Sequence, residues 1–166
     1  EYEGTYPLPE AQLDRFMLKI IVGYPAADEE MQLLEKHRQG FRSGELDQTD
    51  LRPVVDAAAI TTARKAVRRV LVERPILEYI AAIARKTRDW PSLSLGASPR
   101  AALTLLSASQ ALAAIRGRDF VTPDDVKAMS IPVLRHRLIL RPEAEVEGVR
   151  PDHVVTRILE TIPVPR

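Results

Sequence analysis

The stretch Gly96-Ala97-Ser98-Pro99-Arg100-Ala101 begins the helix around which the rest of the sequence can be arranged. Ser98 suits the N-cap position, and Pro99 suits the first helical position, where a missing N–H has no helical partner to lose. The apolar residues that follow recur at helical spacing until Gly117, and they are Leu105, Ala108, Leu112 and Ile115. This pattern predicts an amphipathic helix that needs other helices to bury its apolar face.

Helical patterns continue on both sides of this first helix. Thr122-Pro123-Asp124-Asp125 combines a hydroxyl cap, a proline and two acids, which together indicate another helix start. Periodicity and end signals predict further helices over residues 8–15, 28–39, 56–72, 76–89 and 154–162. Residues 132–138 fit a short helical piece, residues 90–95 a connector and residues 143–149 an exposed loop. A string of short helices with short connections predicts a helical bundle.

Composition agrees with this fold class and excludes several functions. Hydrophobic residues make up 45% of the 166 residues but aromatic residues only 5%, a balance that favours packed helices. The net charge of +1 gives no overall electrostatic case for nucleic acid or an anionic membrane. Cysteine is absent, so disulfides and thiolate metal sites are excluded, in agreement with a cytoplasmic protein. We expect no membrane insertion, because the apolar stretches are far too short to span a bilayer.

One stretch predicts a strand instead of a helix. Residues 16–22, Phe-Met-Leu-Lys-Ile-Ile-Val, are almost continuously apolar and are followed by Gly23-Tyr24-Pro25. Such a run is typical of a strand buried on both faces of a parallel sheet. Because no other stretch resembles a partner strand, we expect the rest of that sheet to lie upstream of Glu1. The predicted division is a remnant of an α/β core over residues 1–25 and a helical domain over residues 26–166.

Two arginines are candidates for binding an anion. Arg100 falls in the first turn of its helix, where free N–H groups and a guanidinium together suit a phosphate. The alternative is that Arg100 turns outward and pairs with a surface carboxylate. Arg15 ends a short helix and could simply stabilise the dipole of that helix. His37, His136 and His153 lack metal-ligand spacing, so no metal site is predicted.

Several of these stretches resemble segments of the MoxR family of AAA+ ATPases. They match in the expected order and over nearly the whole chain, as residues 5–16, 23–25, 96–101, 122–126, 133–137 and 161–165. The resemblance implies a mainly α fold, namely an AAA+ C-terminal helical lid bundle with a one-strand remnant of the α/β nucleotide-binding core. It also implies ATP hydrolysis coupled to chaperone-like remodelling of partner proteins.

The resemblance assigns roles to particular residues. Arg100 would be the sensor-2 arginine, reaching from the lid towards the γ-phosphate, with Ser98 and Pro99 beside it. Arg15 would be the arginine finger that enters the ATP site of the next subunit. Tyr24 would border the adenine at the core–lid junction, where a simple hinge is the alternative. The family further implies a homo-oligomeric ring, expected to be a hexamer, and partners with von Willebrand factor A domains.

The sequence lacks parts that this activity requires. No G-x-x-x-x-G-K-[ST] loop occurs, and no acidic strand end is present to hold Mg²⁺. We therefore expect ATP and Mg²⁺ to be cofactors of the intact protein, and this chain to be inactive alone. Two alternatives remain open. The first is a stand-alone helical interaction module, which predicts that residues 16–22 join a helix or pack on the bundle. The second is a nucleic-acid-binding domain that uses the basic face of Arg64, Lys65, Arg68 and Arg69.

Overall fold

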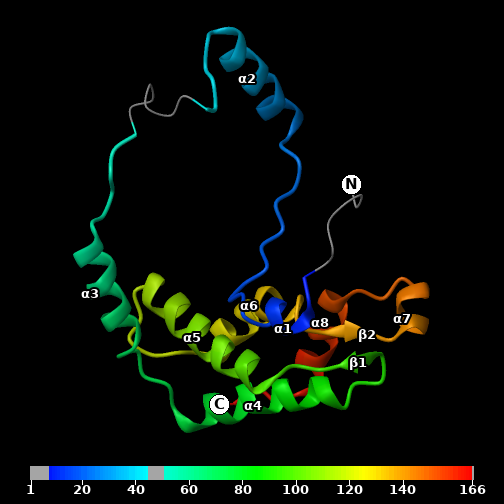
Figure 1. The fold of residues 1–166 in the computed structure, drawn as a ribbon. Coiled ribbons are helices and arrows are strands. Elements are labelled where there is room, and N and C mark those ends of the chain that lie inside the picture. The colour runs from blue at the N-terminus through cyan, green and yellow to red at the C-terminus, as the bar shows by residue number, and fades with distance from the viewer. Residues whose placement is uncertain (1–7, 45–50, 166) are drawn as a thin grey trace. The chain divides into compact units, whose positions relative to one another are not determined.

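The computed structural model describes residues 8–44 and 51–165, and the chain divides into two compact units (Figure 1). The first unit holds the N-terminal residues up to Ile20 together with everything from Ala63 onward. The second unit consists of residues 21–62. Helix α3 (Ala57–Val67) crosses the boundary between the units. The division at residue 25 into a core remnant and a lid stays a prediction.

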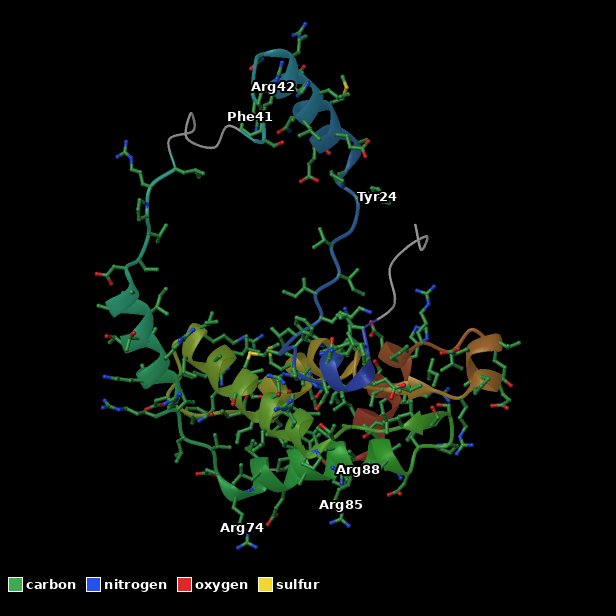
Figure 2. The ribbon with its side chains drawn as sticks, in the orientation of Figure 1. Tyr24, Phe41, Arg42, Arg74, Arg85 and Arg88 are labelled. Carbon is green, nitrogen blue, oxygen red and sulfur yellow. The ribbon has the colours of Figure 1, made fainter. Side chains whose placement is uncertain are left out.

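The second unit contains helix α2 (Ala27–Arg38), whose ends are stabilised locally. Acidic residues 28–30 occupy its first turn and basic residues 36–38 its last, as the helix dipole favours. Arg42 closes the C-terminal end by donating to the carbonyls of His37 at 2.9 Å and Phe41 at 3.1 Å (Figure 2). Every residue described between 21 and 62 is exposed, so local capping, and not a core, supports this helix.

The first unit is a bundle of four main helices, α4 (Arg74–Arg88), α5 (Pro99–Ile115), α6 (Pro123–Leu134) and α8 (Pro151–Thr161). Their facing stripes form one hydrophobic core. Each fully buried aliphatic side chain contributes about 1.5–3 kcal/mol. The largest apolar side chains with almost no exposed surface are Ile83, Leu105, Leu134, Ile158, Val126, Val133 and Val155. The structure thus confirms the predicted helical bundle.

A buried carboxylate fixes the start of α6. Asp125 has no exposed surface and accepts hydrogen bonds from the backbone and hydroxyl of Thr122, both at 2.9 Å. Arg118 donates to both oxygens of the same carboxylate, and Arg116 donates to one at 3.0 Å. Burial alone would raise the pKa of Asp125, but the hydrogen bonds from Arg118 and Thr122 outweigh it and hold the pKa well below its usual range.

Two short strands were not predicted. Strand β1 (Leu93–Leu95) pairs antiparallel with β2 (Ile139–Leu140), and an irregularity in β1 interrupts the register. Strand β1 lies in the segment predicted as a connector, and β2 begins directly after the predicted helical piece of residues 132–138. Helix α7 (Pro142–Val146) occupies a stretch predicted as an exposed loop, because Ala144 turns into the core. Helix α3 ends earlier than predicted, since Leu71 forms an isolated parallel bridge with Phe120.

The predicted strand over residues 16–22 does not form. Residues 18–26 have no regular secondary structure, and the side chains of Ile20 and Val22 are 74% and 88% exposed. A parallel strand needs a neighbouring strand, and the described residues offer none beside this segment. The start of the segment is attached to the bundle through the carbonyls of Phe16 and Met17, which accept hydrogen bonds from Arg137. The Lys19 N–H donates to the Pro132 carbonyl at 2.9 Å, and Leu18 packs partly buried against the core.

Candidate functional site

The junction between β1 and α5 is held tightly against helix α4. A Cβ atom at Gly96 would lie 2.7 Å from the Cα and N of Arg88 and from the carbonyl carbon of Thr87. The buried hydroxyl of Thr87 accepts a hydrogen bond from the Ala97 N–H at 2.8 Å, and the Arg88 Nε donates to the Ala97 carbonyl at 2.9 Å. These contacts therefore fix the position at which α5 begins relative to α4.

Ser98 and Pro99 begin α5 as the sequence predicts. The Ser98 Oγ accepts a hydrogen bond from the Ala101 N–H at 3.2 Å, as an N-cap does, and Pro99 is the first helical residue. The same hydroxyl donates to the carboxylate of Asp14, 3.0 Å from each oxygen. This contact joins the start of α5 to the end of helix α1 (Glu10–Leu13), 84 residues away in sequence.

Arg100 lies exposed in the first turn of α5. It forms no ion pair within residues 8–44 and 51–165, so the alternative of pairing with a surface carboxylate finds no support there. The charge of Arg100 nevertheless affects a neighbouring buried residue, Arg137. Burial lowers the pKa of Arg137, and after the opposing effect of Asp14 the positive charge of Arg100 lowers it further.

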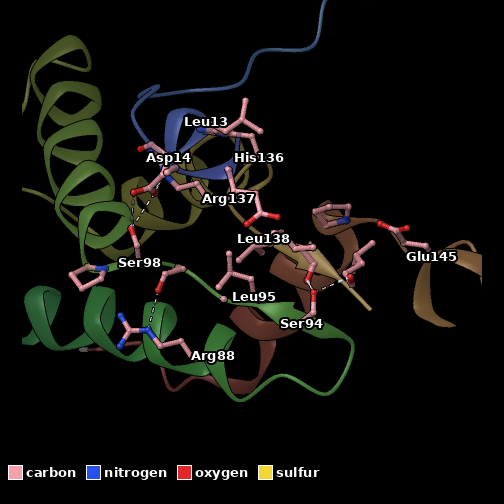
Figure 3. A pocket seen from close by; sticks show the side chains of 18 residues that line it. Leu13, Asp14, Arg88, Ser94, Leu95, Ser98, His136, Arg137, Leu138 and Glu145 are labelled. Carbon is pink, nitrogen blue, oxygen red and sulfur yellow. Dashed lines mark hydrogen bonds and ion pairs between the residues drawn. The ribbon is translucent and has the colours of Figure 1, made fainter. Parts of the chain in front are cut away.

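Arg137 is the centre of a buried cluster between α1 and α6 (Figure 3). Its side chain is 1% exposed, and its Nε donates to Asp14 Oδ1 at 3.0 Å. The terminal nitrogens donate to the carbonyls of Asp14 at 3.0 Å, Phe16 at 2.6 Å and Met17 at 3.2 Å, and also to the carbonyl of Val133. The sequence did not predict this cluster, because it left residues 135–137 either as the polar face of a helix end or as a contact with a neighbouring subunit or a phosphate.

Arg15 follows Asp14 directly and lies on the turn that this cluster holds. Helix α1 ends at Leu13, Asp14 is its C-cap, and the Arg15 N–H donates to the Gln12 carbonyl at 3.1 Å. The Arg15 side chain is exposed and has no ion pair in the part of the chain that the structure describes. Its backbone is therefore ordered while its guanidinium is available to another molecule.

His136 lies beside the same turn, and its surroundings lower its pKa. Its Nε2 lies 3.0 Å from the Phe16 carbonyl, which requires the proton on that nitrogen. The buried Nδ1 has no hydrogen-bond partner. Burial lowers the pKa of His136, the hydrogen bond to the Phe16 carbonyl opposes this, and the charges of Arg137 and Lys19 lower the pKa further. No group of three His, Cys, Asp or Glu residues in the described ranges could hold a metal ion.

An open pocket of about 800 Å³ lies next to the cluster (Figure 3). Apolar residues such as Leu13, Leu95 and Leu138 line it together with Arg88 and Arg137. Arg137 cannot bind a phosphate there without giving up its own hydrogen bonds. Arg88 already uses its Nε on the Ala97 carbonyl, whereas the exposed Arg15 and Arg100 have no ion pair in the described ranges and are the candidates for an anion.

The described residues fit only part of an ATP site. Arg15 and Arg100 suit the terminal phosphates of a nucleotide, but the described residues contain no acidic cluster for Mg²⁺. The Ser98 hydroxyl already bridges Ala101 and Asp14, so it positions α5 and has no donor left for a ligand. Tyr24 is 98% exposed in the second unit, and its contact with adenine stays a prediction (Figure 2).

Sequence reasoning did not predict the contacts of four residues that shape this site, namely Asp14, Thr87, Gly96 and Arg137. Only Gly96 carried a local signal, because a glycine just before a Ser-Pro helix start indicates a close backbone approach. The other three act through partners distant in sequence.

Among the described helices, none combines the length and the apolar character that crossing a bilayer requires.

Comparisons with known proteins agree with this architecture. Residues 85–158 match the model of the AAA lid domain. The chain is 41% identical to YeaC of Bacillus subtilis over 99% of its own length and 50% of that protein. It is 35% identical to chaperone MoxR1 of Mycobacterium tuberculosis, over 100% of its own length and 45% of that protein.

A solved structure extends the likeness to three dimensions. The crystal structure of a proposed ATPase from Cytophaga hutchinsonii superposes with a TM-score of 0.87 at 31% identity, over 100% of this chain and 52% of that one. The chain thus spans about half the length of the relatives it matches. On the lid-domain match, the full-chain likeness to MoxR proteins and the shared fold, the chain belongs to the MoxR family of AAA+ ATPases.

Proposed function

We propose that the full-length product of this gene is a ring-forming ATPase in which Arg15 is the arginine finger and Arg100 is the sensor-2 arginine. The observation that carries this proposal is the state of these two side chains. Both guanidinium groups are exposed and free of ion pairs in the described ranges, although the backbone beside each is firmly held. A cation that is mounted rigidly and left unpaired suits an anionic ligand brought by another part of the assembly.

The chemistry explains why both positions need arginine. ATP with Mg²⁺ supplies the phosphoryl group that is transferred to water. Charge on the terminal phosphoryl group is redistributed as it leaves, and a guanidinium stays protonated throughout and can donate two parallel hydrogen bonds. Donors fixed in advance stabilise that charge without reorganising during the reaction. Arg15 and Arg100 would therefore act on the hydrolysis step more than on nucleotide affinity.

The two arginines serve one nucleotide in this proposal. The sequence predicted that Arg15 enters the neighbouring subunit's site and that Arg100 serves its own. The Ser98–Asp14 hydrogen bond favours a different arrangement, because it joins the residue before Arg15 to the helix start that carries Arg100. If Arg15 reaches across to the neighbour, the same face of the subunit carries Arg100 towards the same phosphates.

The wider role follows from the family. The relative MoxR1 carries the name of a chaperone, which supports ATP-driven remodelling of partner proteins. Domain motion between the nucleotide-binding core and the lid would transmit the nucleotide state to that partner. A cytoplasmic hexamer and partners with von Willebrand factor A domains complete the proposal, and these rest on the family resemblance.

Single substitutions in the full-length product test the two roles. Arg15→Ala and Arg100→Ala should each lower kcat strongly, by about 10³-fold for the finger, because an arginine finger contributes 10³–10⁵-fold in related phosphoryl transfers. Nucleotide affinity should change little. Arg64→Ala is the matched control, since Arg64 is also exposed and unpaired in the described residues but lies on α3. Unchanged kcat in both variants would end the proposal.

Mixed rings separate action on a subunit's own site from action on its neighbour's. Each arginine variant is mixed with subunits that keep both arginines but cannot bind ATP. A residue that acts on the neighbour is supplied by the binding-defective subunit, so activity returns. A residue that acts on its own site cannot be supplied in this way. Recovery with Arg15→Ala but not with Arg100→Ala would support the arrangement predicted from sequence and refute the shared site.

A further inference from the structure

The guanidinium of Arg137 makes most of its hydrogen bonds to the turn around Arg15. Five hydrogen bonds leave its three nitrogens, one from Nε and two from each terminal nitrogen, which equals the five N–H groups of arginine. Four of the five go to Asp14, Phe16 and Met17. The fifth goes to Val133 on α6, which anchors the guanidinium to the bundle.

This pattern fixes the backbone around Arg15 and leaves its side chain alone. The carbonyls of Asp14 and Phe16, one residue to either side, both accept from the same terminal nitrogen of Arg137. His136 adds a further hydrogen bond to the Phe16 carbonyl at 3.0 Å. The direction in which the Arg15 Cα–Cβ bond points is consequently set by Arg137, while the Arg15 guanidinium remains exposed.

We propose that Arg137 is a positioning residue for Arg15, and that its ion pair with Asp14 couples the finger to the start of the sensor-2 helix. Asp14 accepts from Arg137 with one oxygen and from the Ser98 hydroxyl with both. A displacement of α5 would therefore move the carboxylate, the guanidinium and the turn together. The inference rests on the proposed function of Arg15 and assigns Arg137 no contact with nucleotide.

Arginine is required here for its shape as well as its charge. Its planar fork reaches several acceptors at once, whereas a lysine ammonium has three donors on a single nitrogen. Arg137→Lys keeps the charge opposite Asp14 but must abandon at least two of the five acceptors. The turn would then hold Arg15 less closely, and a displacement of about 1 Å at a reacting group can cost roughly 100-fold in rate.

A purely structural role is the competing explanation, and the chain provides a matched control. Asp125 and Arg118 also form a buried carboxylate–arginine network in the first unit. The hydrogen bonds of that network go to residues at the α5–α6 junction, and none reaches α1. Arg118→Lys thus weakens a comparable network without touching the Arg15 turn.

The experiment measures kcat, nucleotide affinity and melting temperature in the full-length product. Arg137→Lys should lower kcat by about 10- to 100-fold with nucleotide affinity unchanged. Arg118→Lys should lower the melting temperature but leave kcat unchanged below it. The double variant Arg15→Ala/Arg137→Lys should be no slower than Arg15→Ala, because a positioning residue has nothing left to position. Mixed rings with binding-defective subunits should restore activity to Arg137→Lys.

The outcomes separate this inference from the proposed function. If Arg15→Ala lowers kcat while Arg137→Lys does not, the positioning role is refuted and the finger stands. If Arg15→Ala has no effect, the proposed function itself fails. A multiplicative loss in the double variant, or a loss in Arg137→Lys that mixed rings do not restore, would mean that Arg137 does not act through Arg15 and would refute the positioning role. Asp14→Asn provides the same test if Arg137→Lys does not fold.

Discussion

Replacing Gly96 by alanine should cost more stability than a glycine substitution usually does. The new Cβ would lie 2.7 Å from three backbone atoms of Thr87 and Arg88. Carbon atoms in contact normally stay about 3.5–4.0 Å apart, so each contact is roughly 1 Å too short. No side-chain rotation relieves these contacts, because all three atoms belong to the backbone of α4.

The size of the effect follows from what must move. Either α4 shifts or the β1–α5 junction lifts away, and the second route weakens the 2.8 Å and 2.9 Å hydrogen bonds at Ala97. Overpacking costs about 1–3 kcal/mol, and each weakened hydrogen bond adds about 1 kcal/mol. We expect Gly96→Ala to lower the free energy of unfolding by about 2–4 kcal/mol.

Urea unfolding of the chain, followed by circular dichroism, measures this change. Gly44→Ala is the matched control, because nothing lies within 4 Å of its added Cβ and its φ is not in the left-handed region. That control should shift the unfolding free energy by less than about 1 kcal/mol, in the stabilising direction if at all. Equal effects at Gly96 and Gly44 would refute the close approach of the β1–α5 junction to α4.

Two further predictions concern buried polar groups. Thr87→Val leaves the buried Ala97 N–H without its 2.8 Å acceptor and should cost about 1–3 kcal/mol in urea unfolding, whereas Thr62→Val, at an exposed hydroxyl, should change little. Arg118 and Thr122 hold the pKa of Asp125 well below its unfolded value of about 3.9, so the stabilisation is full above that pH and is lost as the pH falls through the folded pKa. Asp125→Asn should be less stable at pH 7 by about 1.5–3 kcal/mol. Between about pH 5 and pH 2 the stability of this variant should fall less than that of the unaltered chain, so parallel pH profiles of the two unfolding free energies would contradict the prediction.

The helices were predictable because their signals are local. Proline occupies an early position in α4, α5, α6, α7 and α8, and a proline there fits a helix start without any knowledge of the fold. The apolar stripes then follow from the period of 3.6 residues. The same argument identified Ser98 as a cap, and the structure confirms its hydrogen bond to the Ala101 N–H.

The errors fall where structure depends on partners distant in sequence. Residues 16–22 have the composition of a buried strand, but a strand exists only beside another strand, and the described chain provides none there. Strands β1 and β2 are too short for an alternating pattern, so only their contact with each other defines them. Asp14 and Arg137 are separated by 123 positions, and the local sequence around either residue does not predict the contact with the other.

The charges around the Arg137–Asp14 pair bear on why Arg15 and Arg100, the arginines with predicted roles, are exposed whereas Arg137 is buried. Asp14 provides the carboxylate that pairs with Arg137, and that pairing is necessary because a buried guanidinium without an anion is very costly. Arg15 follows this carboxylate in sequence, and Arg100 lies two residues after Ser98, which donates to it; neither arginine has an ion pair in the described ranges. The charge of Arg100 acts unfavourably on the guanidinium of Arg137, so this part of the arrangement opposes folding unless an anion is brought to it. A nucleotide's phosphates would remove that repulsion, and the cluster would then be more stable in the loaded assembly than in the free chain.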